Sequence, residues 1–107
     1  MRKLDRLSIV IPCHNEEDIL KTSYIKLSEV MTSLKRKNLI SSYELLFVNN
    51  GSSDSTEYVL MDIFNNDKSV RIITLRKNFG YQGSISAGLY HSKGDATVTI
   101  DSDLQDP

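Results

Sequence analysis

The sequence predicts an α/β fold in which a parallel sheet is covered by helices on both faces. Four short apolar runs, rich in β-branched residues, alternate with segments long enough to form helices. A helix between consecutive strands implies a right-handed crossover and therefore parallel strands. These observations together predict a three-layer α/β/α arrangement. The predicted strands are 7–11, 43–48, 70–75 and 96–100.

The first strand, 7–11, is closed by Pro12 and is apolar enough to be buried on both faces. Asn15 is predicted to cap the helix that follows, with the acidic run 16–18 complementing its positive end. Apolar residues then recur at spacings of three and four, which predicts that one helical face packs on the sheet. This stripe consists of Leu20, Tyr24, Leu27, Met31 and Leu34, while Lys21, Lys26 and Glu29 are expected to be exposed.

The second strand, 43–48, leads into the polar run 49–54, where Ser53 or Asp54 can cap a second helix. We expect this helix to end at 65–67. Its apolar residues are Val59, Leu60, Ile63 and Phe64.

The third strand, 70–75, is followed by the loop 76–80 and by a third helix over about 82–91, which Gly94 ends. The fourth strand, 96–100, delivers Asp101. The third helix is expected to bury Ile85, Ala87 and Leu89.

Polar residues follow each predicted strand, and ligands of such sheets bind beyond the carboxyl ends of the strands. Four loops are therefore expected to converge on one crevice. Asp101 and Asp103 lie two residues apart after an apolar strand, and carboxylates in this arrangement suit Mg²⁺ or Mn²⁺ together with a phosphate-bearing ligand. The polar clusters are Asn15-Glu16, Asn49-Asn50-Gly51, Arg76-Lys77-Asn78 and Asp101-Ser102-Asp103.

Other kinds of site fit the sequence less well or remain as alternatives. An acidic loop can simply be solvated, and this alternative stays open. A calcium loop starting at Asp101 has Asp106 where glycine is required. The glycine-rich dinucleotide and P-loop patterns are absent, and Ser84–Gly88 lacks the first glycine of a nucleophile elbow.

Composition describes one globular domain over residues 1–107 and excludes some classes of partner. The net charge is −1, from 13 basic and 14 acidic residues, so no overall field attracts nucleic acid. Cys13 is the only cysteine and cannot form an internal disulfide. The start, Met1–Asp5, is too polar for a signal peptide, and no apolar run approaches the roughly 20 residues of a membrane span. A cytoplasmic location is expected.

The motifs together resemble the family 2 inverting glycosyltransferases of GT-A fold, a Rossmann-like sandwich that binds nucleotide-diphosphate sugars. The resemblance covers nearly the whole chain, and the motifs occur in the same order as in the family. It is closest to the branch that transfers a sugar to a polyprenyl phosphate, such as dolichol or undecaprenyl phosphate. The matching segments are Pro12–Glu17, Asn49–Thr56, Lys77–Gln82, Ala87–Leu89, Lys93–Asp95 and Asp101–Pro107.

This resemblance implies a role for particular residues. Asp101, Asp103 and Gln105 would surround the Mg²⁺ or Mn²⁺ that bridges the diphosphate, with Ser102 also contacting the substrate. The other substrate-binding residues implied are Pro12, Asn15 and Glu16 around the nucleoside, Asn50 beside the base, and Lys77, where the family often has Arg, near the phosphates.

One departure from the family concerns the acidic pair after the second strand, which is Asn49-Asn50 in this chain. An amide oxygen still accepts a hydrogen bond from a base, but the negative charge is lost. Both the choice of base and the affinity for the donor, a UDP- or GDP-sugar, depend on this difference.

The family places its catalytic base, its acceptor site and any membrane anchor after the acidic motif. The 107 residues are therefore expected to form a donor-binding half that is inactive alone, in a protein associated with the cytoplasmic face of a membrane. An exposed sheet edge predicts self-association. A soluble or polysaccharide acceptor, a nucleotidyltransferase or phosphatase, and a non-catalytic nucleotide-binding or interaction domain stay open as alternatives.

Overall fold

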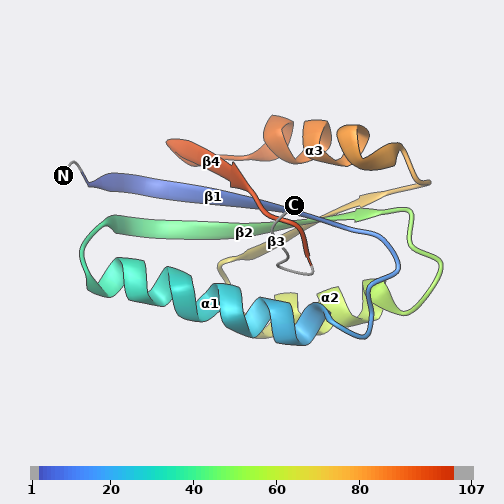
Figure 1. Cartoon of the computed structure of the whole chain (residues 1–107), viewed down its shortest axis with the longest axis horizontal. Coiled ribbons are helices and arrows are strands. Elements are labelled where there is room, and N and C mark those ends of the chain that lie inside the picture. Colours follow the sequence, from blue (N-terminus) through green and yellow to red (C-terminus); the bar gives the residue numbers. More distant parts are fainter. Residues whose placement is uncertain (1–2, 103–107) are drawn as a thin grey trace.

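Figure 1 shows the computed structural model of the chain, which describes residues 3–102. Seven elements alternate as predicted, and the four strands form one parallel sheet in the order β3-β2-β1-β4. The elements are β1 (Leu4–Cys13), α1 (Leu20–Arg36), β2 (Ile40–Asn50), α2 (Thr56–Asn66), β3 (Val70–Leu75), α3 (Gly80–His91) and β4 (Ala96–Thr99).

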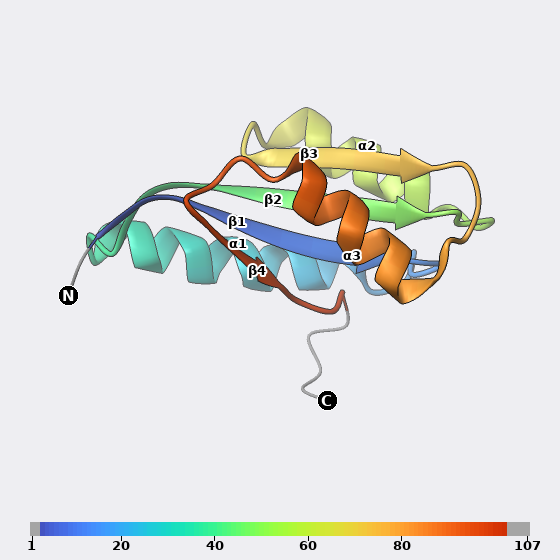
Figure 2. The ribbon, with the colours of Figure 1, turned by 90° about the horizontal axis from the view of Figure 1, so that it is seen from above.

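The strand order reverses beside β1, because the chain adds β2 and β3 on one side of it and then places β4 on the other (Figure 2). In a parallel sheet of this kind, the crevice for a ligand lies at the carboxyl ends of the two strands that flank the reversal. The segments that follow β1 and β4 therefore meet where a site is expected.

Helices α1 and α2 cover one face of the sheet, and α3 covers the other (Figure 1). The predicted three layers are confirmed. The larger core lies under α1 and α2 and includes Ile9, Ile11, Leu20, Leu27, Leu45, Phe47 and Leu60. A smaller core of Val10, Leu46 and Val48 lies on the other face, with Ile85 and Ala87 packed against it. Within residues 3–102 none of the helices has the length and apolar character required to cross a membrane.

The predicted stripe on α1 is confirmed, but the predicted start of the helix is wrong. The helix begins at Leu20, and Asn15 does not cap it. Asn15 has a positive φ of 52°, in the left-handed region that asparagine tolerates better than most residues. A separate turn, in which Ile19 N donates to Glu16 O at 3.2 Å, precedes the helix.

The N-cap residue of α2 is Ser55, one residue after the predicted Asp54, and its side chain makes no capping hydrogen bond. Asp54 still supplies a side-chain acceptor at this end of the helix. Its Oδ1 accepts hydrogen bonds from Thr56 N at 2.9 Å and from Thr56 Oγ1 at 2.5 Å. These bonds satisfy a backbone donor that the helix itself leaves unpaired. They also hold the pKa of Asp54 below its usual value.

The predicted buried face of α3 is partly wrong. Leu89 is 49% exposed, and the residues that α3 buries fully are Ser84 and Gly88. A Cβ on Gly88 would lie 2.3 Å from Val10 Cγ1, so only a glycine lets the helix approach the sheet this closely. Small residues, rather than large apolar ones, therefore make this contact.

Strand β4 is only partly buried, although the sequence predicts an apolar strand here. It pairs only with β1 among the described residues, and Val98 is 44% exposed. An edge strand lacks the neighbour that would cover it, which explains the difference.

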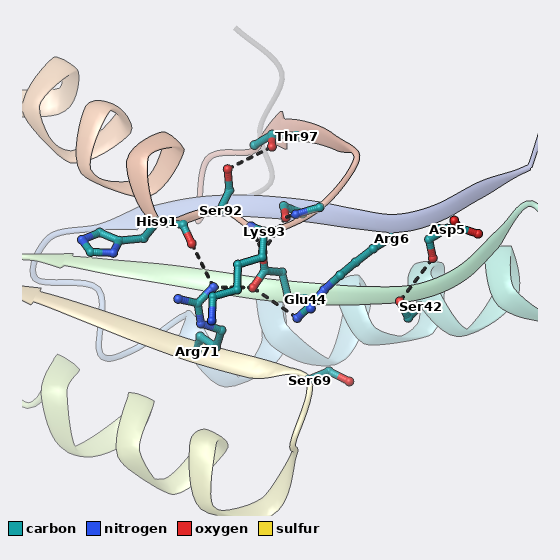
Figure 3. Close-up of polar contacts among 12 residues, drawn as sticks. Asp5, Arg6, Ser42, Glu44, Ser69, Arg71, His91, Ser92, Lys93 and Thr97 are labelled. Atoms are coloured by element: carbon teal, nitrogen blue, oxygen red, sulfur yellow. Dashed lines mark hydrogen bonds and ion pairs between the residues drawn. The ribbon is translucent and has the colours of Figure 1, made fainter.

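Glu44 lies in the middle of β2, and Figure 3 shows its polar partners. Its side chain is buried, at 1% exposed. Ser8 Oγ donates to Oε2 at 2.5 Å, Lys93 N to Oε2 at 2.7 Å, and Arg71 Nη1 to Oε1 at 2.6 Å. Arg6 Nη2 lies 3.6 Å from Oε1. Burial raises the pKa of Glu44, but these hydrogen bonds outweigh it and the pKa lies below the usual value of 4.5.

This depressed pKa predicts an acid-labile fold. A carboxyl whose pKa is lower in the folded than in the unfolded chain stabilises the fold above its unfolded pKa, and this stabilisation disappears as the pH falls through the folded pKa. We expect stability to decrease below about pH 4.5, measured as the urea midpoint at successive pH values. The same profile for Glu44→Gln should be flatter in this range. An equally steep profile in that variant would contradict the assignment to Glu44.

Candidate functional site

A cavity of about 480 Å³ opens at the carboxyl ends of the strands. Each of the four strands contributes to it, either from its carboxyl end, as β2 does with Asn50, or from the segment that follows, so the predicted convergence on one crevice is confirmed. Pro12, Glu16, Asn50, Asp101 and Ser102, all predicted as site residues, line it. The other lining residues are Cys13, His14, Ile19, Asn78, Gly80, Tyr81 and Ser84.

Asn15 is not among the lining residues, because its side chain faces the loop between β2 and α2. Asn15 Oδ1 accepts hydrogen bonds from Ser53 N at 2.8 Å and Asp54 N at 3.3 Å. Asn15 N donates to Ser52 Oγ at 3.0 Å. The left-handed backbone at Asn15 thus allows this residue to join the loop after β1 to the loop after β2. The predicted role of Asn15 in binding a nucleoside stays a prediction.

Glu16 connects the ends of β1 and β4 across the point where the strand order reverses. Its Oε2 accepts a short hydrogen bond from Ser102 Oγ, and its Oε1 accepts one from His14 N at 3.2 Å. Its backbone N donates to Thr56 Oγ1 at 2.9 Å. Glu16 is therefore held at the wall of the cavity by its own loop and by two other segments, at Ser102 and Thr56.

Asn50, the last residue of β2, is 5% exposed and binds the segment between β3 and α3. Its Nδ2 donates to Asn78 Oδ1 at 2.9 Å and to Gly80 O at 3.1 Å, and its Oδ1 accepts from Phe79 N at 2.9 Å. Its backbone O accepts from His14 Nδ1 at 2.7 Å, which places a hydrogen on that ring nitrogen.

Asp101 lies two residues after the end of β4 and contacts α3 through Tyr81. Tyr81 Oη donates to Asp101 Oδ1 at 2.9 Å. This hydrogen bond, together with a little desolvation and the charge of Asp101, raises the pKa of Tyr81. The tyrosine hydroxyl thus keeps its proton and orients the carboxylate at the cavity.

The chemistry of these groups fits a hard divalent cation only in part. Asp101 and Ser102 offer oxygen atoms, as Mg²⁺ and Mn²⁺ prefer. The other predicted ligands, Asp103 and Gln105, lie outside the described residues. Within residues 3–102, no group of three or more His, Cys, Asp and Glu side chains is arranged to hold a metal.

Lys77 is exposed and does not line the cavity. Its Nζ lies 5.2 Å from the centre of the Phe79 ring, a cation–π distance. The predicted approach of Lys77 to phosphates stays a prediction. The lysine side chain is flexible and has other rotamers available, so its position in this structure does not decide where it lies when a phosphate is bound.

Cys13 lines the cavity but is 1% exposed. Burial, and then the charge of Glu16, raise the pKa of its thiol. The thiol is therefore neutral, and a thiolate nucleophile has no basis at this position.

Sequence reasoning did not assign a role to His14, Asn78 or Tyr81, although each lies in the cavity wall. Asn78 was expected at the crevice as part of the polar cluster Arg76-Lys77-Asn78, but without a role of its own, and Tyr81 was recognised only as part of the motif segment 77–82. A signal was available for Tyr81: it lies at the start of α3, and the start of a helix that follows a strand lies at the carboxyl edge of a parallel sheet.

Comparison with known proteins identifies the family. The model of glycosyl transferase family 2 matches residues 8–107. The chain belongs to this family. The resemblance recognised in its motifs is confirmed.

Two curated relatives and one solved structure illustrate the similarity. An uncharacterized glycosyltransferase of Synechocystis is 44% identical over 101 residues, 94% of this chain and 30% of the relative. An undecaprenyl-phosphate 4-deoxy-4-formamido-L-arabinose transferase of Proteus mirabilis is 38% identical over 106 residues, 98% of this chain and 31% of the relative. The chain thus spans about a third of the length of these relatives.

The solved structure is a mannosyltransferase of Pyrobaculum calidifontis in complex with GDP-Man and Mn²⁺. It superposes with a TM-score of 0.80 at 17% identity, over 95% of this chain and 28% of the mannosyltransferase. At this identity the similarity establishes the fold, which confirms the predicted GT-A arrangement.

Proposed function

We propose that the cavity binds the nucleoside diphosphate of a sugar donor, and that the whole protein transfers the sugar to a polyprenyl phosphate with inversion. The observation that carries the proposal is the juxtaposition of Asp101, Ser102 and Glu16 beside the reversal of strand order, in a chain of glycosyl transferase family 2. The GDP-Man and Mn²⁺ in the mannosyltransferase complex support a donor and a divalent cation in this fold.

Asp101 would hold Mg²⁺ or Mn²⁺ together with Asp103 and Gln105. When bound, such a cation neutralises charge on a leaving diphosphate. Tyr81 would keep the Asp101 carboxylate oriented by its hydrogen bond, and Glu16 would orient the Ser102 hydroxyl. The nucleoside would lie against Pro12 and the loop after β1, in the wall of the cavity.

Donor binding is tested by thermal unfolding of the whole protein with UDP or GDP, each with and without Mn²⁺. A ligand at 100 times its Kd stabilises the folded state by about 2.7 kcal/mol. We expect such stabilisation only with nucleotide and Mn²⁺ together, and its loss in Asp101→Asn.

Asp95→Asn is the matched control, because Asp95 lies before β4, at the opposite end of the strand from Asp101. Its Oδ2 accepts a hydrogen bond from Arg6 N at 2.9 Å, which an asparagine oxygen can also accept. This variant should respond to nucleotide and Mn²⁺ as the unchanged protein does. Equal responses in Asp101→Asn and Asp95→Asn would contradict a cation site at Asp101.

The acceptor is the second part of the proposal, and the undecaprenyl-phosphate transferase relative supports it. A phosphate acceptor is already anionic and needs little help from a general base. Because a polyprenyl chain resides in a membrane, we place the whole protein at the cytoplasmic membrane face. Transfer of labelled sugar into lipid extracts of membranes containing undecaprenyl phosphate is the expected result. Transfer to a water-soluble acceptor alone would contradict it.

A further inference from the structure

We propose that Asn50 is a positioning residue, whose carboxamide holds the segment Lys77–Gly80 against the end of β2, and that this position requires an amide rather than an acid. The consequence for donor binding rests on the function proposed above; the positioning role itself does not.

The orientation of the Asn50 carboxamide is determined by its backbone partners. Phe79 N–H can only donate, and its partner at 2.9 Å must therefore be Oδ1. Gly80 O can only accept, so its partner at 3.1 Å must be Nδ2. The second hydrogen of Nδ2 points to Asn78 Oδ1 at 2.9 Å. Both amide hydrogens and one oxygen lone pair are thus used within the protein.

An aspartate at position 50 keeps the bond from Phe79 N but loses both donated bonds. Its second oxygen would face Asn78 Oδ1 and Gly80 O, which are both acceptors. Rotation of the Asn78 amide would not repair this, because Asn78 Oδ1 also accepts a hydrogen bond from Gly80 N at 2.7 Å. A buried carboxylate would then lie among acceptor oxygens, an arrangement that is costly at 5% exposure.

The segment that Asn50 holds forms part of the cavity. Asn78, Gly80 and Tyr81 all line it, and Tyr81 in turn donates to Asp101. The Asn50 carboxamide thus fixes the start of α3, and through it the tyrosine that contacts the predicted cation ligand. Asn50 therefore acts on donor binding through these residues.

The same Asn→Asp change at positions 50 and 78 shows whether the loss of stability is specific to Asn50 or follows from any such change in the cavity wall. Asn50→Asp removes two donated bonds, whereas Asn78→Asp keeps both bonds that Asn78 Oδ1 accepts. In the whole protein without nucleotide, we expect Asn50→Asp to lower Tm by about 5 °C or more and Asn78→Asp to leave it within about 2 °C. Amide exchange at Phe79 and Gly80 should become about tenfold faster only in Asn50→Asp.

Donor affinity is then measured for Asn50→Asp by titration with nucleotide and Mn²⁺, and should fall about tenfold. Unchanged Tm and exchange in Asn50→Asp, or equal losses in Asn78→Asp, would overturn the positioning role. If Asn50→Asp shows the expected Tm loss and faster exchange while the unchanged protein binds no nucleotide, the positioning role is supported and the proposed donor site is wrong. If donor affinity falls in Asn50→Asp without any change in exchange, Asn50 contacts the donor and the inference is wrong.

Discussion

Replacing Glu44 by alanine is expected to lower the free energy of unfolding by about 3–5 kcal/mol, a large part of the total for a domain of this size. The carboxylate receives donors from three separate segments, and the Arg71 guanidinium, 2.6 Å away, would keep its charge without this partner. Ser8 Oγ and Lys93 N would also lose their acceptor. Urea unfolding followed by circular dichroism measures the loss.

An exposed ion pair provides the control. Lys21 Nζ lies 2.9 Å from Asp62 Oδ2, with side chains that are 63% and 57% exposed. Because solvent screens such a pair, Asp62→Ala should cost less than about 1 kcal/mol. Similar losses in the two variants would show that the buried network contributes no more than a surface contact.

The Glu44 network also extends toward the site. Ser8 Oγ, which donates to Glu44, accepts a hydrogen bond from Gly94 N at 2.8 Å. Gly94 lies against β1, where an added Cβ would be 2.7 Å from Ser8 N. The network thereby fixes the connection from α3 into β4, the strand that delivers Asp101 to the cavity.

The alternation of strands and helices could be predicted from the sequence because periodicity reports which face of each element is buried. The convergence of the loops followed from the same reasoning, since parallel strands end at one edge. Asn15 was misassigned because a cap and a loop tether use the same side-chain oxygen. Only the positive φ of Asn15 in the folded chain distinguishes the loop tether from a helix cap.

Tertiary partners explain what could not be predicted. Glu44 is one acid in an apolar strand, and its donors lie 27 to 49 residues away in the sequence. Leu89 matched a helical apolar pattern, but α3 approaches the sheet through Gly88 and Ser84 instead. The proposed positioning role of Asn50 depends on its hydrogen bonds to the segment 78–80, and a comparison of sequence motifs does not show such contacts.

Gly51→Ala is expected to lower the free energy of unfolding by about 2–5 kcal/mol. Gly51 has a φ of +66°, which costs an alanine about 1–2 kcal/mol. A Cβ there would also lie 2.3 Å from Asn78 N and 2.3 Å from Lys77 C, both backbone atoms. Backbone cannot rotate away as a side chain can, so the segment between β3 and α3 must move.

Gly80→Ala separates these two contributions. Gly80 has a similar φ of +79°, but nothing lies within 4 Å of its added Cβ. This variant should therefore lose only the conformational part, about 1–2 kcal/mol, in the same urea measurement. Equal losses at the two glycines would mean that the loops adjust without cost. A larger loss at Gly51, with faster exchange at Asn78, would show that the end of β2 and the wall of the cavity are packed as one unit.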